Sequence, residues 1–334
     1  MLDGLTKENL IDRNFSITRF TPSLPLAYSS APRYSVTYNG VRFFFLLLVP
    51  SGQLGNQLFG LACALQHSQY SSEKIYVLIS NTELLERIKS GKAGDLREFN
   101  VVVVSNRIVR LCISYLFRTL DYCGGKQFFN WAVINLERWF KTLEHPWLAI
   151  DFETSRGSRC LVVRGYFQNV KMIKSLSYAQ RKALKRIIGY TEGAGSEIVP
   201  NTIGLHVRRG DYEKISDYGT LSIDYFLSAV TRLAKQNNAV VASSDSETTL
   251  DMLSQRIKVI KLVPSRVSPL KTIQTLARSK SFIMSNSTFS FWIGWLVSES
   301  GGIVVAPDPW FKRTEVPNDY LFLDTFLRNQ SHFD

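Results

Sequence analysis

Between residues 202 and 305 the sequence alternates short apolar runs with longer amphipathic runs, and this alternation limits the possible folds more than any other feature. The apolar runs predict strands at 202–206, 239–243, 258–260, 281–284 and 302–305. The amphipathic runs predict helices at 222–236, 246–255, 268–278 and 287–299. Strands that alternate with helices of ten or more residues are typical of a parallel, doubly wound sheet. The segment is therefore predicted to form an α/β domain.

The first half of the chain opens with a similar pattern. A strand at 41–49, a glycine-rich loop, a helix at 55–70 and a strand at 75–79 predict a βαβ unit. Beyond it, residues 106–147 are aromatic-rich and mostly helical in pattern, 168–188 predict a basic helix, and 191–200 are the expected hinge. The predicted parts are an N-terminal extension (1–40), an acceptor-side α/β domain with a helical insertion (41–190), a donor-binding α/β domain (191–313) and a C-terminal segment (314–334).

Length and composition fit two folded domains. The chain has 334 residues, against roughly 150 for an average domain, and 45% hydrophobic with 20% charged residues is typical of a folded protein. The longest apolar run, 43–49, is predicted to be a buried strand because it is much shorter than the roughly 20 residues of a membrane span. Because the chain also opens without a signal-peptide pattern, we expect a cytoplasmic protein.

The chain is strongly basic. It holds 40 Lys and Arg against 28 Asp and Glu, a net charge of +12 that favours polyanionic partners. Residues 156–190 contain nine Lys or Arg and no Asp or Glu. This basic stretch is interpreted either as a solvated helix face or as a patch for peripheral contact with the anionic inner face of a membrane. A nucleic-acid-binding module is an unfavoured alternative, because few aromatic residues interleave with the basic ones.

Polar clusters follow three of the predicted strands in the second half. Residues 206–212 follow the strand at 202–206, Ser243 to Asp245 follow the next strand, and Ser285 to Thr288 lead from a strand into a helix. In an open parallel sheet, ligands bind outside the carboxyl ends of the strands. We therefore expect the three clusters to face one binding site.

Two adjacent arginines, Arg208 and Arg209, are the strongest candidates for binding an anion in this site. They lie on a loop that Gly210 allows to bend, and guanidinium groups match phosphate oxygens bidentately. A diphosphate is the expected partner. In the alternative interpretation the arginines pair with acidic residues of the same loop, which are Asp211, Glu213 and Asp217.

The other two clusters each allow two interpretations. The residues before the helix at 287–299 are Ser285, Asn286, Ser287 and Thr288. They can bind phosphate through hydroxyl and backbone N–H groups, or simply cap the helix. Asp245 can accept hydrogen bonds from a guanine base or from ribose hydroxyls, or cap the helix at 246–255.

A glycine-rich turn at 51–57 opens the first predicted helix. Gly52 and Gly55 permit close approach of the backbone to a ligand. The turn lacks a lysine after its second glycine, so it is not a P-loop, and its spacing differs from the dinucleotide-binding fingerprint. No Asp-x-Asp pair and no Cys/His arrangement predicts a metal site.

The motifs resemble those of a known family. They are Gly52-Gln-Leu-Gly-Asn-Gln57, Gly165-Tyr-Phe-Gln168, His206-Val-Arg-Arg-Gly-Asp-Tyr212, Ser244-Asp245 and Ser285-Asn-Ser-Thr-Phe-Ser290. Their order is similar to that in the alpha-1,2-fucosyltransferases, and the resemblance covers about residues 41–310. The third and fifth motifs are specific to that family and its protein O-fucosyltransferase and alpha-1,6-fucosyltransferase relatives.

The resemblance implies an α/β protein of the GT-B type, with two Rossmann-like lobes and the donor site in the cleft between them. It implies transfer of L-fucose from GDP-fucose to the 2-hydroxyl group of a galactoside, with inversion and without a metal or other cofactor. The expected acceptor is a galactose-terminated glycan, with a lipid-linked precursor of O-antigen or another surface glycan as one form. Another nucleotide sugar as donor remains the alternative.

The resemblance also implies roles for individual residues. Arg208 corresponds to the arginine that holds the β-phosphate, and Ser287 with Thr288 to the diphosphate contacts. His206 and Asp245 correspond to nucleotide-binding positions. Asn56 corresponds to the asparagine that reaches the donor from the other lobe.

The general base is predicted from chemistry, since the acceptor hydroxyl must lose a proton to a group within hydrogen-bond reach. Glu213 and Asp217 share the loop that carries the arginines and are the candidate carboxylates. In the alternative, a phosphate oxygen of the leaving GDP takes the proton.

Overall fold

The computed structural model describes most of the chain from residue 159 onward and shorter stretches before it. The described residues are 15–16, 37–38, 43–50, 52–69, 74–91, 94–104, 133–135, 159–190, 199–214, 218–233, 239–245, 247–257, 259–263, 266–313 and 321–334. Contacts divide the chain into two compact units. The first comprises Met1–Ser51, Cys63–Ser80 and Leu96–Tyr166, and the second comprises Gly52–Ala62, Asn81–Asp95 and Phe167–Asp334.

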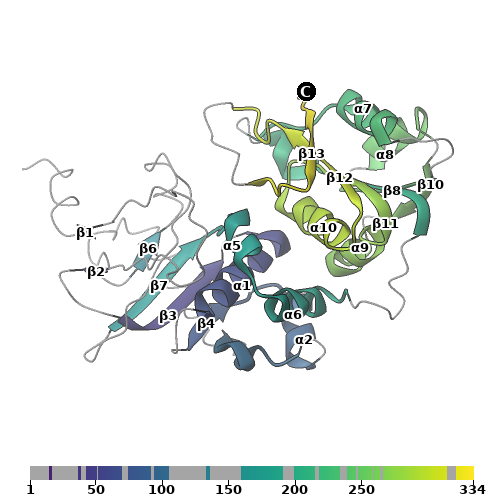
Figure 1. Ribbon diagram of the computed structural model, residues 1–334. Helices are drawn as coiled ribbons and strands as arrows, with labels where there is room; N and C mark the ends of the chain where they lie inside the picture. The colour runs from purple at the N-terminus through teal and green to yellow at the C-terminus, as the bar shows by residue number, and fades with distance from the viewer. Residues whose placement is uncertain are drawn as a thin grey trace, which may run out of the picture. The chain divides into compact units, whose positions relative to one another are not determined.

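The first unit holds a five-stranded parallel sheet, drawn in Figure 1. Its strands are β3 (Phe43–Pro50), β4 (Ile75–Leu78), β5 (Val101–Val104), β6 (Val133–Asn135) and β7 (Arg159–Gly165), in the order β5-β4-β3-β7-β6. A separate antiparallel pair is formed by β1 (Phe15–Ser16) and β2 (Thr37–Tyr38). The predicted buried strand is β3, in which Leu47 and Leu48 are buried.

The helix predicted at 55–70 is confirmed as α1 (Leu54–Ser68). The patterns did not predict α2 (Thr82–Lys89), the 3-10 helix η1 (Leu96–Phe99), β5 or β7. Residues 106–147 fall mostly outside the described residues. The part that is described, β6, is a strand, so the helical prediction is wrong there, because Val133 to Asn135 pair with β7.

The second unit holds a six-stranded parallel sheet. Its strands are β8 (Val199–Val207), β9 (Ala239–Ser244), β10 (Val259–Val263), β11 (Ser279–Ile283), β12 (Ile303–Asp308) and β13 (Phe326–Gln330), in the order β10-β9-β8-β11-β12-β13. This order is that of a Rossmann sheet, which reverses its winding between β8 and β11. Two α/β units with parallel sheets confirm the predicted α/β class of the GT-B type.

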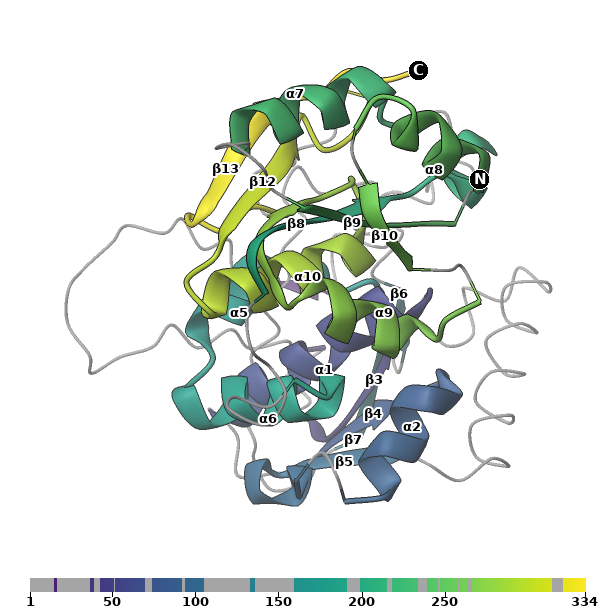
Figure 2. The ribbon, with the colours of Figure 1, turned by 90° about the vertical axis from the view of Figure 1, so that its right-hand side faces the viewer.

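Helices cover both faces of this second sheet, and all four lie close to their predicted positions. α7 (Ile223–Leu233) and α8 (Glu247–Ser254) lie on one face, and α9 (Pro269–Leu276) and α10 (Thr288–Glu299) lie on the other, as Figures 1 and 2 show. Apolar side chains from α7, α8 and the strands form one core, with Tyr225 and Phe226 at its centre. Burial of these rings and of the aliphatic side chains around them stabilises the packing of the helices on the sheet.

The middle of helix α10, from Phe291 to Val297, is apolar on every side and buried. One side packs on β11 and β12. On the other, Phe59 of α1 lies with its ring centroid 4.9 Å from Phe291 and 5.0 Å from Trp292. A helix that is hydrophobic all round is expected to be buried in this way.

The basic helix predicted at 168–188 is two helices, α5 (Val170–Ser175) and α6 (Tyr178–Ile188). The break comes from Ser177, whose hydroxyl caps α6 in a capping box with Gln180. Two of its basic residues, Arg181 and Lys185, pair with Glu299 of α10 at 3.9 and 3.2 Å. The positive charge of α6 is therefore partly neutralised by Glu299 within the second unit.

The predicted boundary at residue 190 lies inside the second unit, since the side chain of Gln274 donates to the carbonyl of Ile188 at 2.9 Å. Residues 314–334, predicted as a separate segment, include β13, which pairs with β12 in parallel. Within the described ranges, every helix falls short of the length and apolarity that crossing a membrane requires.

Candidate functional site

The candidate site lies where the second sheet reverses its winding, at the carboxyl ends of β8 and β11. Ligands of doubly wound sheets bind at this point because the loops leave the two strands in opposite directions. The three polar clusters predicted from the sequence follow β8, β9 and β11. The structure thus brings them to adjacent strand ends, as expected.

His206 connects the two central strands. Its Nδ1 atom lies 3.2 Å from the hydroxyl of Ser285, and its ring centroid lies 4.9 Å from that of Phe289. Burial, helped by the positive charge of Arg208, lowers the pKa of His206 from 6.5 to about 3. The imidazole is therefore neutral at physiological pH and acts as a polar link rather than as a cation.

The turn from Ser285 to Ser287 is buried and hydrogen-bonded. The Ser287 hydroxyl accepts from the amide of Ser290 at 3.1 Å, which confirms the helix-capping interpretation for this residue. Its own oxygen also lies 3.3 Å from the Ser285 hydroxyl. Asn286 is fully buried and donates to the carbonyls of Tyr218 and Gly219 at 3.1 and 3.0 Å.

Arg208 is held between two carboxylates. Its guanidinium group lies 2.6 Å from Asp211 and 3.0 Å from Asp245, and it also stacks 5.5 Å from the ring centroid of Tyr212. The pair with Asp211 corresponds to the alternative interpretation, in which the arginines bind acidic residues of their own loop. An anionic ligand that approaches Arg208 would exchange with Asp211, whose side chain is half exposed.

Asp245 faces Arg208, Arg209 and Gly210, which we call the arginine loop, with both carboxylate oxygens. Its Oδ1 accepts from the amide of Arg209 at 2.8 Å, and its Oδ2 pairs with Arg208. The φ of Gly210 is +36°, and a Cβ there would lie 2.6 Å from the same Oδ2. The glycine is needed here for both its backbone angle and its lack of a side chain.

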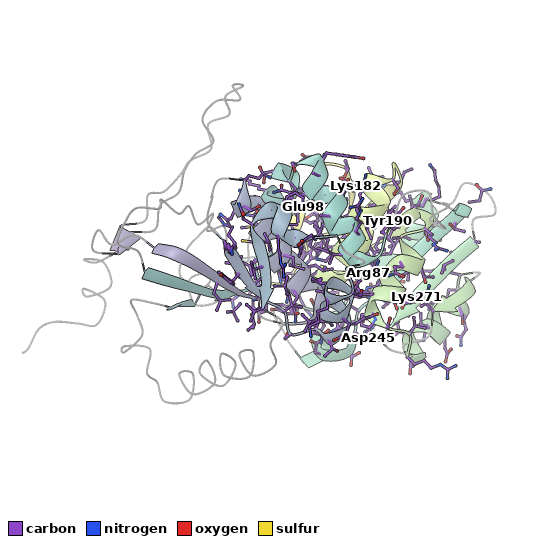
Figure 3. All side chains as sticks on the ribbon, turned by 90° about the horizontal axis from the view of Figure 1, so that it is seen from below. Arg87, Glu98, Lys182, Tyr190, Asp245 and Lys271 are labelled. Carbon is purple, nitrogen blue, oxygen red and sulfur yellow. The ribbon has the colours of Figure 1, made fainter. Side chains whose placement is uncertain are left out.

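Asp245 also lies away from the basic helix. In Figure 3, Lys182, which marks α6, is well separated from Asp245. The basic stretch is therefore not part of the cluster around Arg208.

Arg209 points to a different partner. Its guanidinium group pairs with Asp334 at 2.5 Å and lies 3.5 Å from the Thr220 hydroxyl. The two adjacent guanidinium groups thus have separate environments, since that of Arg208 pairs with Asp211 and Asp245 and that of Arg209 pairs with Asp334. No sequence pattern pointed to Asp334, because it is far from Arg209 along the chain.

The two candidate bases are placed differently. Glu213 is exposed on the short 3-10 helix η3 (Gly210–Lys214) that follows the arginines. Asp217 lies outside the described residues.

The glycine-rich turn meets the start of α10 within the second unit. A Cβ on Gly55 would lie 2.6 Å from the Thr288 hydroxyl oxygen and 2.7 Å from the backbone nitrogen of Phe289. The indole nitrogen of Trp292 donates to the Gly55 carbonyl at 2.8 Å. The close approach that Gly55 permits in the structure is to the first turn of α10, whereas the approach to a ligand stays a prediction.

Asn56 follows this glycine and is half-buried, and its side-chain oxygen accepts from Gln168 at 3.0 Å. Two motifs that are far apart in the sequence, the glycine-rich turn and the segment 165–168, are joined by this hydrogen bond. Both residues belong to the second unit.

The arrangement can bind an anion next to a preorganised helix start. It offers one oriented guanidinium group, a neutral imidazole and the capped N-terminus of α10, and a helix N-terminus favours negative charge. In the part of the chain that the structure describes, no three His, Cys, Asp or Glu side chains converge as a metal-binding site would require.

Comparison with known proteins identifies related sequences. The profile described as Glycosyl transferase family 11 matches residues 150–320, about half of the chain. An alpha-1,2-colitosyltransferase from Escherichia coli is 30% identical over 126 residues, which make up 35% of this chain and 43% of that protein. The O-antigen biosynthesis glycosyltransferase WbnK from Escherichia coli is 28% identical over 119 residues, 33% of this chain and 39% of that protein. The match spans less than half the length of either relative.

Two solved structures of glycosyltransferases are also similar. The fucosyltransferase NodZ from Bradyrhizobium aligns over 76% of this chain and 92% of its own, with 15% identity and a TM-score of 0.45. The Escherichia coli heptosyltransferase WaaC with ADP aligns over 85% of this chain and 92% of its own, with 10% identity and a TM-score of 0.42.

Proposed function

Because this chain belongs to glycosyl transferase family 11, we propose that it transfers L-fucose from GDP-fucose to the 2-hydroxyl group of a galactoside, with inversion at the anomeric carbon. The observation that best supports this is the position of Arg208. Two carboxylates hold its guanidinium group at the end of β8, where the sheet reverses its winding. A guanidinium group fixed at this point suits the diphosphate of a nucleotide sugar.

In the proposed reaction, the bond between the fucose anomeric carbon and the β-phosphate oxygen breaks as the acceptor oxygen bonds to that carbon. Negative charge develops on the leaving GDP. Arg208 stabilises this charge after its contact with Asp211 opens, and the N-terminus of α10 at Ser287 and Thr288 adds a favourable dipole. The N-terminus of α10 is in place before the reaction, whereas Arg208 exchanges Asp211 for the phosphate while Asp245 continues to hold it.

The proton of the acceptor hydroxyl is proposed to pass to Glu213, to Asp217 or to a phosphate oxygen of GDP. Of the two carboxylates, Glu213 is exposed near the arginine loop and is free to approach an acceptor.

Asp245 is proposed to orient the arginine loop. Both of its oxygens already serve Arg208 and the amide of Arg209, which leaves them engaged rather than open to a ribose or a guanine. Asn56, His206 and Asn286 are proposed to shape the donor site from its surrounding turns.

A second donor deserves equal testing because of the similarity to an alpha-1,2-colitosyltransferase. Colitose is L-fucose without its 3-hydroxyl group. A site that binds one of these sugars can therefore resemble a site that binds the other. The proposed acceptor is a galactose-terminated, lipid-linked precursor of a surface glycan, in line with the relative named for O-antigen biosynthesis.

The donor is tested directly by a transfer assay. The purified full chain is incubated with galactosides and, in parallel, with radiolabelled GDP-fucose, GDP-colitose, GDP-mannose and UDP-sugars. Transfer from GDP-fucose with an α-1,2 linkage in the product is the expected result. Preferential transfer from GDP-colitose would assign the second donor, and transfer only from a UDP-sugar would contradict a GDP-sugar site.

Excess EDTA is expected to leave the transfer rate unchanged, because fixed cationic and helix N-terminal groups supply the charge stabilisation that a metal would otherwise give. The measurement is the initial rate before and after EDTA, with a UDP-sugar transferase known to need Mn²⁺ assayed alongside as the control. Loss of activity with EDTA and recovery with Mg²⁺ or Mn²⁺ would contradict this mechanism.

A further inference from the structure

Residues 331–334 run antiparallel to residues 220–222 in the second unit. The amide of Asp334 donates to the carbonyl of Thr220 at 3.0 Å, and Leu221 forms a bridge with Phe333. The amide of Ser222 in turn donates to the carbonyl of residue 332 at 2.7 Å. We call residues 331–334 the clasp.

The clasp is hydrogen-bonded to Lys312, in the segment that follows β12. The amide of Lys312 donates to the carbonyl of Tyr218 at 3.1 Å, and its side-chain Nζ donates to the carbonyl of Asp334 at 2.6 Å. Lys312 thus binds both the clasp and the loop at 218–220, which lies beside the clasp.

Gly219 shows how closely this loop and the clasp pack. Its φ is +68°, and a Cβ there would lie 2.6 Å from Cβ of Lys312 and 2.8 Å from the ring of Phe333. The carbonyl of Gly219 also accepts from the buried side chain of Asn286 in the turn before α10. Residues 218–219 are therefore held from two sides, by Asn286 and by Lys312.

Arg209 joins the clasp to the candidate site. Its amide is held by Asp245, while its guanidinium group is held by Asp334 and by the hydroxyl of Thr220. The Arg209 side chain is only 15% exposed, whereas that of Asp334 is 45% exposed. A largely buried cation needs a charged partner, and removal of that partner drives it toward other carboxylates.

We propose that Asp334 is a positioning residue for the donor site, acting through Arg209 on the arginine loop; this inference rests on the proposed function. While Asp334 neutralises Arg209, the carboxylates Asp211 and Asp245 stay with Arg208 and aim it at the site. Without the Asp334 carboxylate, Arg209 competes for Asp245, and the direction of Arg208 is lost.

The variant Asp334→Asn keeps the size and hydrogen-bonding shape of the side chain and removes its charge. We expect its affinity for GDP, measured by calorimetry, to fall about tenfold, as for neighbouring groups that are energetically coupled. In the free protein we expect faster hydrogen exchange at residues 209–222, with unchanged exchange in β11 and α10. The conservative variant Asp334→Glu is expected to recover at least half of the lost affinity, which a purely structural role would not require.

Asp324→Asn is the matched control. Asp324 is also an exposed carboxylate of the second unit, but it pairs with Lys174 of α5 at 2.7 Å. Its replacement is expected to leave GDP affinity and exchange at 209–222 unchanged.

The outcomes separate this inference from the proposed function. A wild-type chain that does not bind GDP contradicts the proposed function, while hydrogen exchange still decides whether Asp334 orders the arginine loop. If the wild type binds GDP and Asp334→Asn binds it equally well, the positioning role is wrong. If Asp334→Asn fails to fold, the same comparison is made between the wild type and Asp334→Ser, which also removes the carboxylate; an affinity and exchange pattern identical to those of the wild type would then overturn the role.

Discussion

Replacing Arg208 with alanine is expected to remove nearly all transfer activity while the fold stays intact. The reason is the loss of the one oriented guanidinium group that would meet the charge on the leaving diphosphate. Loss of one such preorganised group typically raises the activation free energy by about 3–4 kcal/mol, roughly a hundredfold to a thousandfold in rate. The measurement is kcat/KM with the preferred donor, together with a thermal unfolding curve.

Arg208→Lys is expected to restore little of this activity, because an ammonium group cannot contact Asp245 and two phosphate oxygens with the geometry of a guanidinium group. Arg256→Ala is the control. Arg256 is an exposed arginine of the same unit, and it pairs with Asp224 of α7 at 3.8 Å rather than with a carboxylate of the candidate site. If either Arg208 variant keeps more than half of the wild-type activity, Arg208 has no part in the mechanism.

Replacing Gly55 with alanine is expected to destabilise the protein strongly and to disturb the start of α10. The added methyl group would lie within 2.7 Å of Thr288 and of the Phe289 backbone nitrogen, and backbone atoms cannot turn aside as a flexible side chain can. Overpacking of this kind costs about 1–3 kcal/mol. The change is measured as the difference in unfolding free energy from urea titration.

Gly55→Ala is a stringent test because helix propensity alone predicts that it stabilises the protein, whereas packing against α10 predicts that it destabilises it. Gly55 lies in the first turn of α1, where alanine would otherwise stabilise a helix by up to about 1 kcal/mol. Gly91→Ala serves for comparison, because a Cβ at Gly91 meets nothing within 4 Å and only the backbone angle of +71° opposes it. A Gly55→Ala variant as stable as the wild type would contradict the close packing of the glycine-rich turn on α10.

The elements of the second unit were largely predictable because each depends on nearby residues. Alternating apolar and amphipathic runs predicted β8 to β12 and α7 to α10, with boundaries displaced by only a few residues. Apolar periodicity reports which face of a helix or strand is buried, and this is a local property. The position of the three polar clusters followed from the same pattern, since a parallel sheet brings the ends of its strands to one edge.

Other elements were missed for an equally physical reason. The strand β13 is short and polar in places, and it becomes a strand because β12 offers a free edge beside it. The division of the basic stretch into α5 and α6 did have a local signal, the capping box of Ser177 and Gln180. The continuous run of helix-forming basic residues around it hid that signal.

The sequence by itself determined the α/β class and the strand ends that carry the polar residues, and it left open whether Arg208 pairs with a carboxylate of its own loop. Only the tertiary structure decided that Arg209 turns to Asp334, and that Gly55 packs on the first turn of α10. The local conformation of a chain depends on residues a few positions apart, so it leaves a mark in the sequence pattern. Partners that are distant along the chain meet only after the sheet and its helices have packed, and no periodicity marks them in advance.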